Sequence, residues 1–187
     1  MSYTAHVDTF AHDNLPPIDQ WPEMIFDLPE LQYGDRLNAA AELLDRAVER
    51  GWGERVAVRG ADLNLTYAQL LEKSNQVARV LLEDAGLVPG NRVLLRGPNN
   101  PMTAVIWFGV IKAGLIAVAT MPMLRQKELS EIVEKAQVTA AVCDERFAQE
   151  LMNTRQHSPV LHHIIYYNSN GSPDSLEARM ANKATTF

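Results

Sequence analysis

The sequence is short of cysteine and of positive charge. It has 187 residues and a single cysteine, Cys143, so no disulfide can form within the chain. Such sparse cysteine use is typical of the reducing cytoplasm, where we expect this protein to be located. The formal net charge of −6 provides no basic surface, so we expect neither nucleic acid nor an anionic membrane as a partner. The opening residues MSYTAHVDTFAHD have no basic start and no apolar run, so no secretory signal is expected.

The chain also lacks a hydrophobic run that is both long and unbroken, although residues 102–123 come near to one. A lysine such as Lys112 near the centre of a membrane helix costs about 2.5 to 3.5 kcal/mol, which many apolar neighbours can offset, so hydropathy alone leaves a membrane span open. Gly114 in the middle and Pro122 at the end interrupt the stretch, and strand and helix patterns continue on both sides. We therefore predict a folded segment that does not cross a membrane.

Residues 91–122 show three hydrophobic patterns in succession. Val93–Leu95 is a short apolar run closed by turn-forming residues, which predicts a buried strand. A helix is predicted over Pro101–Ala113, because proline fits the first helical position and Asn100 before it is a natural N-cap. A glycine then ends the helix, and the apolar run Leu115–Ala119 predicts a second strand.

The lengths of these elements predict that the two strands are parallel. The helix spans roughly 20 Å and the second strand roughly 17 Å, so the helix can return the chain along one strand. Strands that are apolar throughout belong to sheets covered on both faces, and the crossovers between parallel strands are right-handed. The predicted fold class is therefore α/β, with a mostly parallel sheet flanked by helices.

The other elements follow from the same signals. Apolar residues at helical spacing predict amphipathic helices, and short apolar runs predict strands. Helices are expected over Asn38–Glu49, Thr66–Ala85, 129–136, Arg146–Met152 and, more weakly, Ser175–Asn182. Strands are expected over Val138–Cys143 and Leu161–Tyr167, and a short antiparallel hairpin is expected from Val56–Val58 and Asn64–Thr66 around the turn Gly60–Asp62.

Residues 1–35 show no lasting hydrophobic period. Prolines at positions 16, 17, 22 and 29 deny this segment a regular hydrogen-bond ladder. We interpret it as an extended arm whose apolar side chains, Trp21, Ile25, Phe26 and Leu28, pack on the body of the protein. The alternative is a frayed tail, but disordered segments are poor in such side chains.

The segment Gly97–Pro101 follows a predicted parallel strand and precedes a helix, which is where open α/β sheets bind ligands. It contains neither a dinucleotide-binding glycine pattern nor a phosphate loop of the Walker type, and Pro98 and Pro101 remove amides that a phosphate would need. We interpret the segment as a structural turn, with a ligand loop as the alternative.

A metal site could be formed by Cys143 with the histidines His157, His162 and His163. Neighbouring residues in a strand point to opposite faces, so His162 and His163 cannot both reach one ion, and we expect no zinc. Cys143 as a nucleophile would need a base beside it. We interpret it as a small buried hydrophobic residue.

Two pairs of carboxylates are candidates for acid–base catalysis, namely Asp144 with Glu145 and Glu131 with Glu134. These residues lie where helices are predicted to begin or on solvated helix faces, where carboxylates usually complement the helix dipole. We expect that structural role for both pairs.

The loop Thr120–Gln126 follows a predicted strand end, so Arg125 in this loop is a candidate for substrate contact. Residues such as Arg125 and Lys127 are more often simply the polar start of the next helix, and we prefer that interpretation. The residues considered so far, taken alone, do not amount to an active site.

Four stretches together resemble the N-terminal region of the adenylate-forming superfamily, which includes acyl- and aryl-CoA synthetases, luciferases and adenylation domains. They are LTYAQL, NRVLLRGPNNPMTAVIWFGVIKAG, VATMPML and VEKAQVTAAVCD. The resemblance covers nearly the whole chain. The arm DTFAHDNLPPIDQWP and the segments LNAAAELLDRAVERG and LVPGNRVLLRGPNNPM look most similar to benzoate-type CoA ligases, particularly 2-aminobenzoate-CoA ligase.

The resemblance implies a two-step reaction in a complete enzyme. A carboxylate, here a small aromatic acid, attacks the α-phosphate of Mg-ATP to give an acyl-adenylate and pyrophosphate, and the thiol of coenzyme A then displaces AMP. Residues 36–187 correspond to the N-terminal part of the family's AMP-binding large domain. Mg²⁺, ATP and coenzyme A are therefore expected for the full-length enzyme, and none of them is expected to bind this chain alone.

The family's glycine-rich phosphate loop, its later acidic motifs and its C-terminal domain with the catalytic lysine do not match any part of the chain. Lys112 does not correspond to that lysine, and we assign no catalytic, cofactor-binding or metal-binding role to any residue. The tail Lys183–Phe187 has neither a cap nor a charged ending, so we expect a piece of a longer protein that is inactive by itself.

Two alternatives remain at this point. The complete protein is a CoA ligase for an aliphatic or another acid, or the chain is a free-standing interaction module without chemistry. A sheet cut short should also leave apolar surface uncovered, so we expect self-association, with a homo-oligomer as one form.

Overall fold

The structure is a computed structural model that describes residues 4–61, 63–169 and 171–187. Its centre is the predicted strand–helix–strand unit, formed by β3 (Arg92–Arg96), α3 (Pro101–Lys112) and β4 (Ile116–Thr120). The Asn100 side chain caps α3 by accepting a hydrogen bond of 2.8 Å from the backbone N–H of Thr103. Gly114, two residues after the end of the helix, has a φ of +71°, a conformation that glycine adopts without strain.

The sheet contains four strands in the order β4-β3-β5-β6, and each neighbouring pair is parallel. β5 spans Val138–Asp144 and β6 spans His163–Tyr167. Val93 of β3 lies opposite Ala117 of β4 and Ala140 of β5. The predicted α/β class with a parallel sheet is therefore confirmed.

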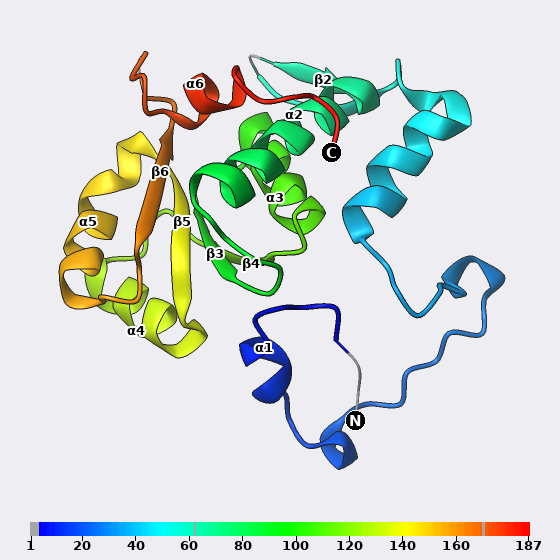
Figure 1. Ribbon diagram of the computed structural model, residues 1–187, viewed down its shortest axis with the longest axis horizontal. Helices are drawn as coiled ribbons and strands as arrows, with labels where there is room; N and C mark the ends of the chain where they lie inside the picture. Colours follow the sequence, from blue (N-terminus) through cyan, green and yellow to red (C-terminus); the bar gives the residue numbers. More distant parts are fainter. Residues whose placement is uncertain (1–3, 62, 170) are drawn as a thin grey trace.

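Helices cover both faces of this sheet (Figure 1). One face packs against α2 (Tyr67–Arg79), α3 and α6 (Leu176–Met180), and the other against α4 (Gln126–Ala136) and α5 (Ala148–His157). Side chains of β3 alternate between the two cores, with Val93 and Leu95 in the first and Leu94 in the second. Burial on both faces explains why this strand reads as a continuous apolar run.

The elements that precede the sheet agree with the predictions in type. The helix expected over Asn38–Glu49 is observed with two π-helical segments, η3 (Ala41–Asp45) and η4 (Val48–Trp52), and the second runs past the predicted end to Trp52. The hairpin consists of β1 (Val56–Arg59) and β2 (Asn64–Thr66), which are antiparallel; its predicted turn includes Asp62, which lies outside the described residues. Thr66 and Gln69 form the predicted capping box of α2, which continues into the π-helical η5 (Val80–Asp84).

Two boundaries near the end of the chain differ from the predictions. The helix expected over Arg146–Met152 is a 3-10 turn, η6 (Glu145–Phe147), followed by α5, which runs five residues further to His157. No glycine or proline stands between Met152 and His157, so nothing in that stretch stops the helix early. The helix expected over Ser175–Asn182 is α6, which ends earlier than predicted, at Met180.

The prediction that the apolar side chains of the arm pack on the body is wrong. Trp21, Ile25, Phe26 and Leu28 are between 41% and 64% exposed. The arm contains α1 (Phe10–Asp13) and the 3-10 turns η1 (Ile18–Gln20) and η2 (Pro29–Leu31), and Figure 1 shows it leading away from the sheet.

The arm is held to the body by polar groups instead. The N–H groups of Val7 and Asp8 both donate to Pro89 O at 2.9 Å. The Asp8 carboxylate accepts a hydrogen bond of 2.7 Å from Asn91 and pairs with the Arg92 guanidinium. The part of the arm that docks is therefore close to its start, and its apolar middle is left without cover.

Within the described ranges, none of the helices is both long and apolar enough to cross a membrane. Lys112, in the middle of the apolar stretch, is buried at the end of α3, where its Nζ lies 2.5 Å from both carboxylate oxygens of Asp45. The pair explains how a lysine can stand in this stretch, because a buried charge must be paired.

Candidate functional site

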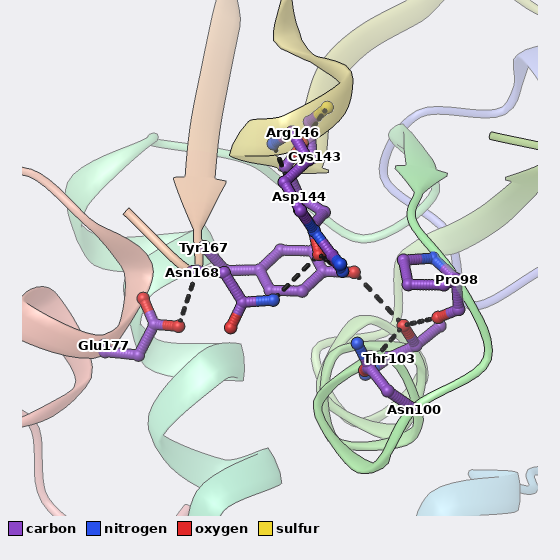
Figure 2. Close-up of polar contacts among 9 residues, drawn as sticks. All are labelled: Pro98, Asn100, Thr103, Cys143, Asp144, Arg146, Tyr167, Asn168 and Glu177. Atoms are coloured by element: carbon purple, nitrogen blue, oxygen red, sulfur yellow. Dashed lines mark hydrogen bonds and ion pairs between the residues drawn. The ribbon is translucent and has the colours of Figure 1, made fainter. Parts of the chain in front are cut away.

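The carboxyl ends of the four parallel strands lie along one edge of the sheet. Arg96, Thr120, Asp144 and Tyr167 are the last residues of β3, β4, β5 and β6. Parallel α/β sheets bind ligands at this edge, and polar side chains from several loops meet here (Figure 2). It is therefore the first place to look for a functional site.

Asp144 is the centre of a polar network, and it is fully buried. Its two carboxylate oxygens accept hydrogen bonds of 2.9 and 2.8 Å from the Arg146 guanidinium and 2.8 Å from Asn168 Nδ2. Burial raises the pKa of this carboxyl group, but the hydrogen bonds from Arg146 and Asn168 outweigh that effect and hold the pKa below its usual value of 3.8. Asp144 is therefore a charged structural acceptor rather than a proton donor.

Tyr167 closes the same edge from β6. Its buried hydroxyl lies 3.2 Å from Thr103 Oγ1, and burial raises its pKa to about 12. A Cβ atom at Gly97 would stand only 1.9 Å from the Tyr167 hydroxyl. The glycine after β3 is thus required by close packing against a tyrosine from β6.

Polar groups of the turn Gly97–Pro101 form hydrogen bonds with the first turn of α3. Thr103 Oγ1 donates to Pro98 O at 2.7 Å, and the Asn100 side chain caps α3. These hydrogen bonds agree with the structural interpretation of the turn.

Arg96 is the residue at this edge that the sequence did not single out. It is 2% exposed, and its guanidinium donates to three backbone carbonyls, those of Phe147, Met121 and Leu124, at 3.2, 3.3 and 2.9 Å. Arg96 thereby ties together the loops that follow β4 and β5. The only sequence signal is its position at the end of a strand that is predicted to be buried on both faces.

A hollow of about 210 Å³ lies beside Arg96, and Arg125, Arg146, Phe147 and Glu150 are among the residues that line it. Arg125 is exposed and pairs with Glu150 at 3.0 Å, and the N–H of Gln126 donates to the same carboxylate. Arg125 therefore stands at the start of α4, as expected, and also faces a polar hollow. Lys127 is exposed in the first turn of α4.

The structure does not bring the histidines to the cysteine. His157, His162 and His163 are exposed, whereas Cys143 is completely buried. His163 lies opposite Ala140, three residues before Cys143 on β5, which corresponds to roughly 10 Å along the strands. Burial raises the pKa of the Cys143 thiol to about 12, so this cysteine is a small buried residue, as predicted, and not a nucleophile.

The predicted pairs of carboxylates have separate surroundings. Glu131 and Glu134 are exposed on α4. Glu145 is exposed in the first turn of η6, and Asp144 caps that turn by accepting a hydrogen bond from the N–H of Arg146. Asp144 lies at a helix start, as expected, but its complete burial was not predicted.

The residues described do not by themselves fit ATP with magnesium. Both oxygens of Asp144 are already engaged by Arg146 and Asn168, so this carboxylate is not free for a metal ion. In the described ranges, no group of three or more histidine, cysteine or acidic side chains is placed to hold one. The turn after β3 has two prolines and uses the Thr103 amide for its own cap, so it offers few donors to a phosphate.

Fold and site together define a parallel α/β domain whose strand ends carry a polar edge stabilised by arginine. Comparison with known proteins identifies the family, because the pattern of the AMP-binding enzymes matches residues 44–186. The chain belongs to the AMP-binding enzyme family.

Among curated relatives, the chain is similar to a long-chain-fatty-acid–CoA ligase of Salmonella typhimurium, with 29% identity over 139 residues. The match covers 74% of this chain and 25% of the relative. The chain thus spans about a quarter of the length of the curated relatives that it matches first.

Two solved structures show the same fold. An anthranilate CoA ligase in complex with anthranoyl-AMP matches with a TM-score of 0.72 and 24% identity, over 79% of this chain and 28% of that chain. A benzoate CoA ligase from Burkholderia xenovorans matches with a TM-score of 0.70 and 18% identity, over 81% and 29%. The parallel sheet and the helices that flank it therefore form a fold that is also present in these two ligases.

Proposed function

We propose that this chain is the N-terminal part of an ATP-dependent CoA ligase that acts on an aromatic acid of the benzoate or 2-aminobenzoate type. The whole enzyme joins the acid to coenzyme A in the cytoplasm, uses Mg²⁺ with ATP, and releases AMP and pyrophosphate. Residues 1–35 form its arm and residues 36–187 the first part of its large domain. The phosphate-binding stretch, the metal ligands and the catalytic lysine lie beyond Phe187, so residues 1–187 alone are inactive.

The family match over residues 44–186 is the observation that carries this proposal. It is supported by the fold shared with an anthranilate CoA ligase, whose structure holds anthranoyl-AMP, because anthranilate is 2-aminobenzoate. The saturated hydrogen bonds of Asp144 and of the turn after β3 also support a scaffolding role for this part of the enzyme.

A ligase for an aliphatic acid is the second candidate. It is supported by the similarity to a long-chain-fatty-acid–CoA ligase, with 29% identity over 139 residues. The acid is the point on which the two candidates differ, and the chemistry is the same.

The test is AMP release by the protein extended to the length of its relatives, with ATP, coenzyme A and a panel of acids. The panel contains benzoate, 2-aminobenzoate, and short-chain and long-chain fatty acids, and residues 1–187 serve as the matched control. We expect the highest kcat/KM with one of the two aromatic acids and no turnover by the control. A preference for a fatty acid supports the second candidate, and no AMP release with any acid contradicts both.

A further inference from the structure

The arm is attached to the body of the protein at two points. Near its start, the N–H of Asp8 donates to Pro89 O at 2.9 Å. Just beyond its far end, Asn38 Nδ2 donates to the last carbonyls of α3, those of Ile111 and Lys112, at 3.1 Å each. The chain between these attachments is therefore a loop that is closed on the body, and not a free tail.

The two attachment points lie at one corner of the body. The N–H of Gly90 donates to Gly114 O at 2.9 Å, which joins the two segments that hold the arm. A hollow of about 580 Å³ is lined both by residues 4–6, from the start of the arm, and by residues 35–38, from its end. The docking is close, because a Cβ atom at Gly90 would clash with Asp8 O. The loop therefore leaves the body and returns to it at the same place.

The middle of the arm, residues 18–35, exposes large apolar side chains. Six of them are more than half exposed, namely Ile18, Met24, Ile25, Phe26, Leu28 and Tyr33. Aromatic residues and methionine are enriched where proteins contact one another, and an exposed apolar patch marks such a contact. The middle of the arm therefore has the composition of a docking surface.

This segment also has local order of its own. Trp21 Nε1 donates to Pro16 O at 2.7 Å, and the turns η1 and η2 are closed by backbone hydrogen bonds. Prolines at positions 17, 22 and 29 restrict the backbone further. A segment that is partly ordered in advance loses less conformational entropy when it binds.

The middle of the arm is acidic as well as apolar. It has five carboxylates and no lysine or arginine; the acids are Asp19, Glu23, Asp27, Glu30 and Asp35. An apolar surface with a basic border is complementary to such a segment. A second copy of residues 1–187 has a formal net charge of −6 and an equally acidic arm, so the charges of two copies repel. Charge complementarity therefore favours a different partner.

The chain ends close to the second attachment point of the arm. Thr186 O accepts a hydrogen bond of 2.7 Å from Arg79 Nε, and Figure 1 shows the end of the chain beside α2. Val77 of α2 packs on Gly109, where a Cβ atom would clash with it. Because Gly109 begins the last turn of α3, Arg79 and the chain end are near the turn that Asn38 binds.

We propose that the middle of the arm is the docking surface for the part of the same chain that follows Phe187, which covers it with an apolar surface bordered by lysine or arginine. The inference rests on the proposed function, in which residues 1–187 are the first part of a longer enzyme. Both attachment points keep the arm near the place where that part begins, so its effective concentration there is high. The arm then holds the later part of the enzyme against the sheet domain.

The first test is the rate at which a maleimide labels Phe26→Cys, read at that peptide by mass spectrometry. The rate is compared between residues 1–187 and the protein extended to the length of its relatives. We expect labelling at least about tenfold slower in the extended protein, because a covered thiol reacts only when the arm opens. Met152→Cys is the matched control, since Met152 is exposed on α5 at the other face of the sheet, and it is labelled at similar rates in both proteins.

The outcomes of this test separate the possible partners. Equal labelling of Phe26→Cys in the two proteins overturns the inference, and Ile25→Cys provides a second site in case one variant does not dock. Protection that appears only as the concentration of the extended protein rises indicates a second copy and also overturns it. Protection in an extended protein that releases no AMP with any acid contradicts the proposed function and leaves the docking surface supported.

The second test is thermal unfolding of the double variant Ile25→Ser with Phe26→Ser. We expect the Tm of the extended protein to fall by at least about 3 °C, because these side chains are buried there. The Tm of residues 1–187 stays within about 1 °C, since exposed side chains contribute little to stability. An equal shift in the two proteins, or no shift in the extended protein, overturns the inference.

The third test concerns charge. Adding Glu30→Lys to Phe26→Cys raises the labelling rate of the extended protein about threefold or more at low salt and less at high salt, because the lysine repels a basic border. Glu72→Lys is the matched control, since it makes the same change of charge at an exposed position of α2, and it leaves the rate unchanged. A rate that Glu30→Lys does not alter overturns the charge complementarity on which the choice of partner rests.

Discussion

At the scale of single residues, Gly97 carries the tightest packing at the strand ends. Its Cβ position lies 1.9 Å from the Tyr167 hydroxyl, so Gly97→Ala forces one of the two residues to move. We expect a loss of roughly 1 to 3 kcal/mol in the free energy of unfolding, measured by chemical denaturation. The double variant with Tyr167→Phe, which lacks the hydroxyl, recovers part of this loss. Gly34→Ala is the control, since nothing lies within 4 Å of its Cβ position, and an equal loss there would contradict the account.

The lowered pKa of Asp144 predicts how the stability of the folded protein depends on pH. Its pKa in the folded protein lies below the usual value of 3.8, so its contribution to stability is present above that value and is lost as the pH falls through the folded pKa. Asp144→Asn therefore costs roughly 1 to 3 kcal/mol at pH 7, because hydrogen bonds to a charged acceptor are lost. Denaturation at several pH values should show the difference from wild type shrinking below about pH 4. A difference that stays constant down to pH 2, or an equal cost for the exposed Glu145→Gln, contradicts this role.

Cys143 and Arg96 show which single-residue roles could be predicted from the sequence and which could not. The thiol of Cys143 was predicted to be a small buried residue because the apolar run around it is a local signal. Arg96 was missed because its partners, the carbonyls of Met121, Leu124 and Phe147, are 25 to 51 residues away in the chain. The sequence shows an arginine beside a strand, and only the folded structure shows which carbonyls it binds.

At the scale of elements, the strand–helix–strand unit was predictable because its signals are local. The cap at Asn100, the proline at the helix start, Gly114 and the short apolar runs are all read within a few residues. The packing of the arm was not predictable, since it depends on contacts between distant segments. Exposed Trp21 and Phe26 show that an apolar composition does not by itself indicate which surface a segment covers.

The cap of α3 gives a test at this scale. Asn100→Ala removes the acceptor for the Thr103 N–H and should cost about 1 kcal/mol in the free energy of unfolding. Asn99→Ala is the matched control, because Asn99 is exposed in the same turn. Equal melting temperatures for the two variants would show that the cap does not stabilise α3.

At the scale of the whole molecule, residues 1–187 leave apolar surface uncovered. Ile25, Phe26 and Leu28 of the arm are more than half exposed, and β4 is an edge strand with no charged side chain. Uncovered apolar patches and bare sheet edges favour association. We expect residues 1–187 to form oligomers or to be poorly soluble in light scattering, and Ile25→Ser with Phe26→Ser to reduce this. A clean monomer at high concentration contradicts the prediction.

At this scale the central proposal is that residues 1–187 are a scaffold with the parallel sheet of an AMP-binding enzyme and do not bind ATP by themselves. The most direct test is a thermal melt of residues 1–187 with and without millimolar Mg-ATP, beside the protein extended to the length of its relatives. A ligand at 100 times its Kd adds about 2.7 kcal/mol of stability, so binding is visible as a higher Tm. We predict no shift for residues 1–187 and an upward shift for the extended protein. A clear upward shift for residues 1–187 alone would contradict the account.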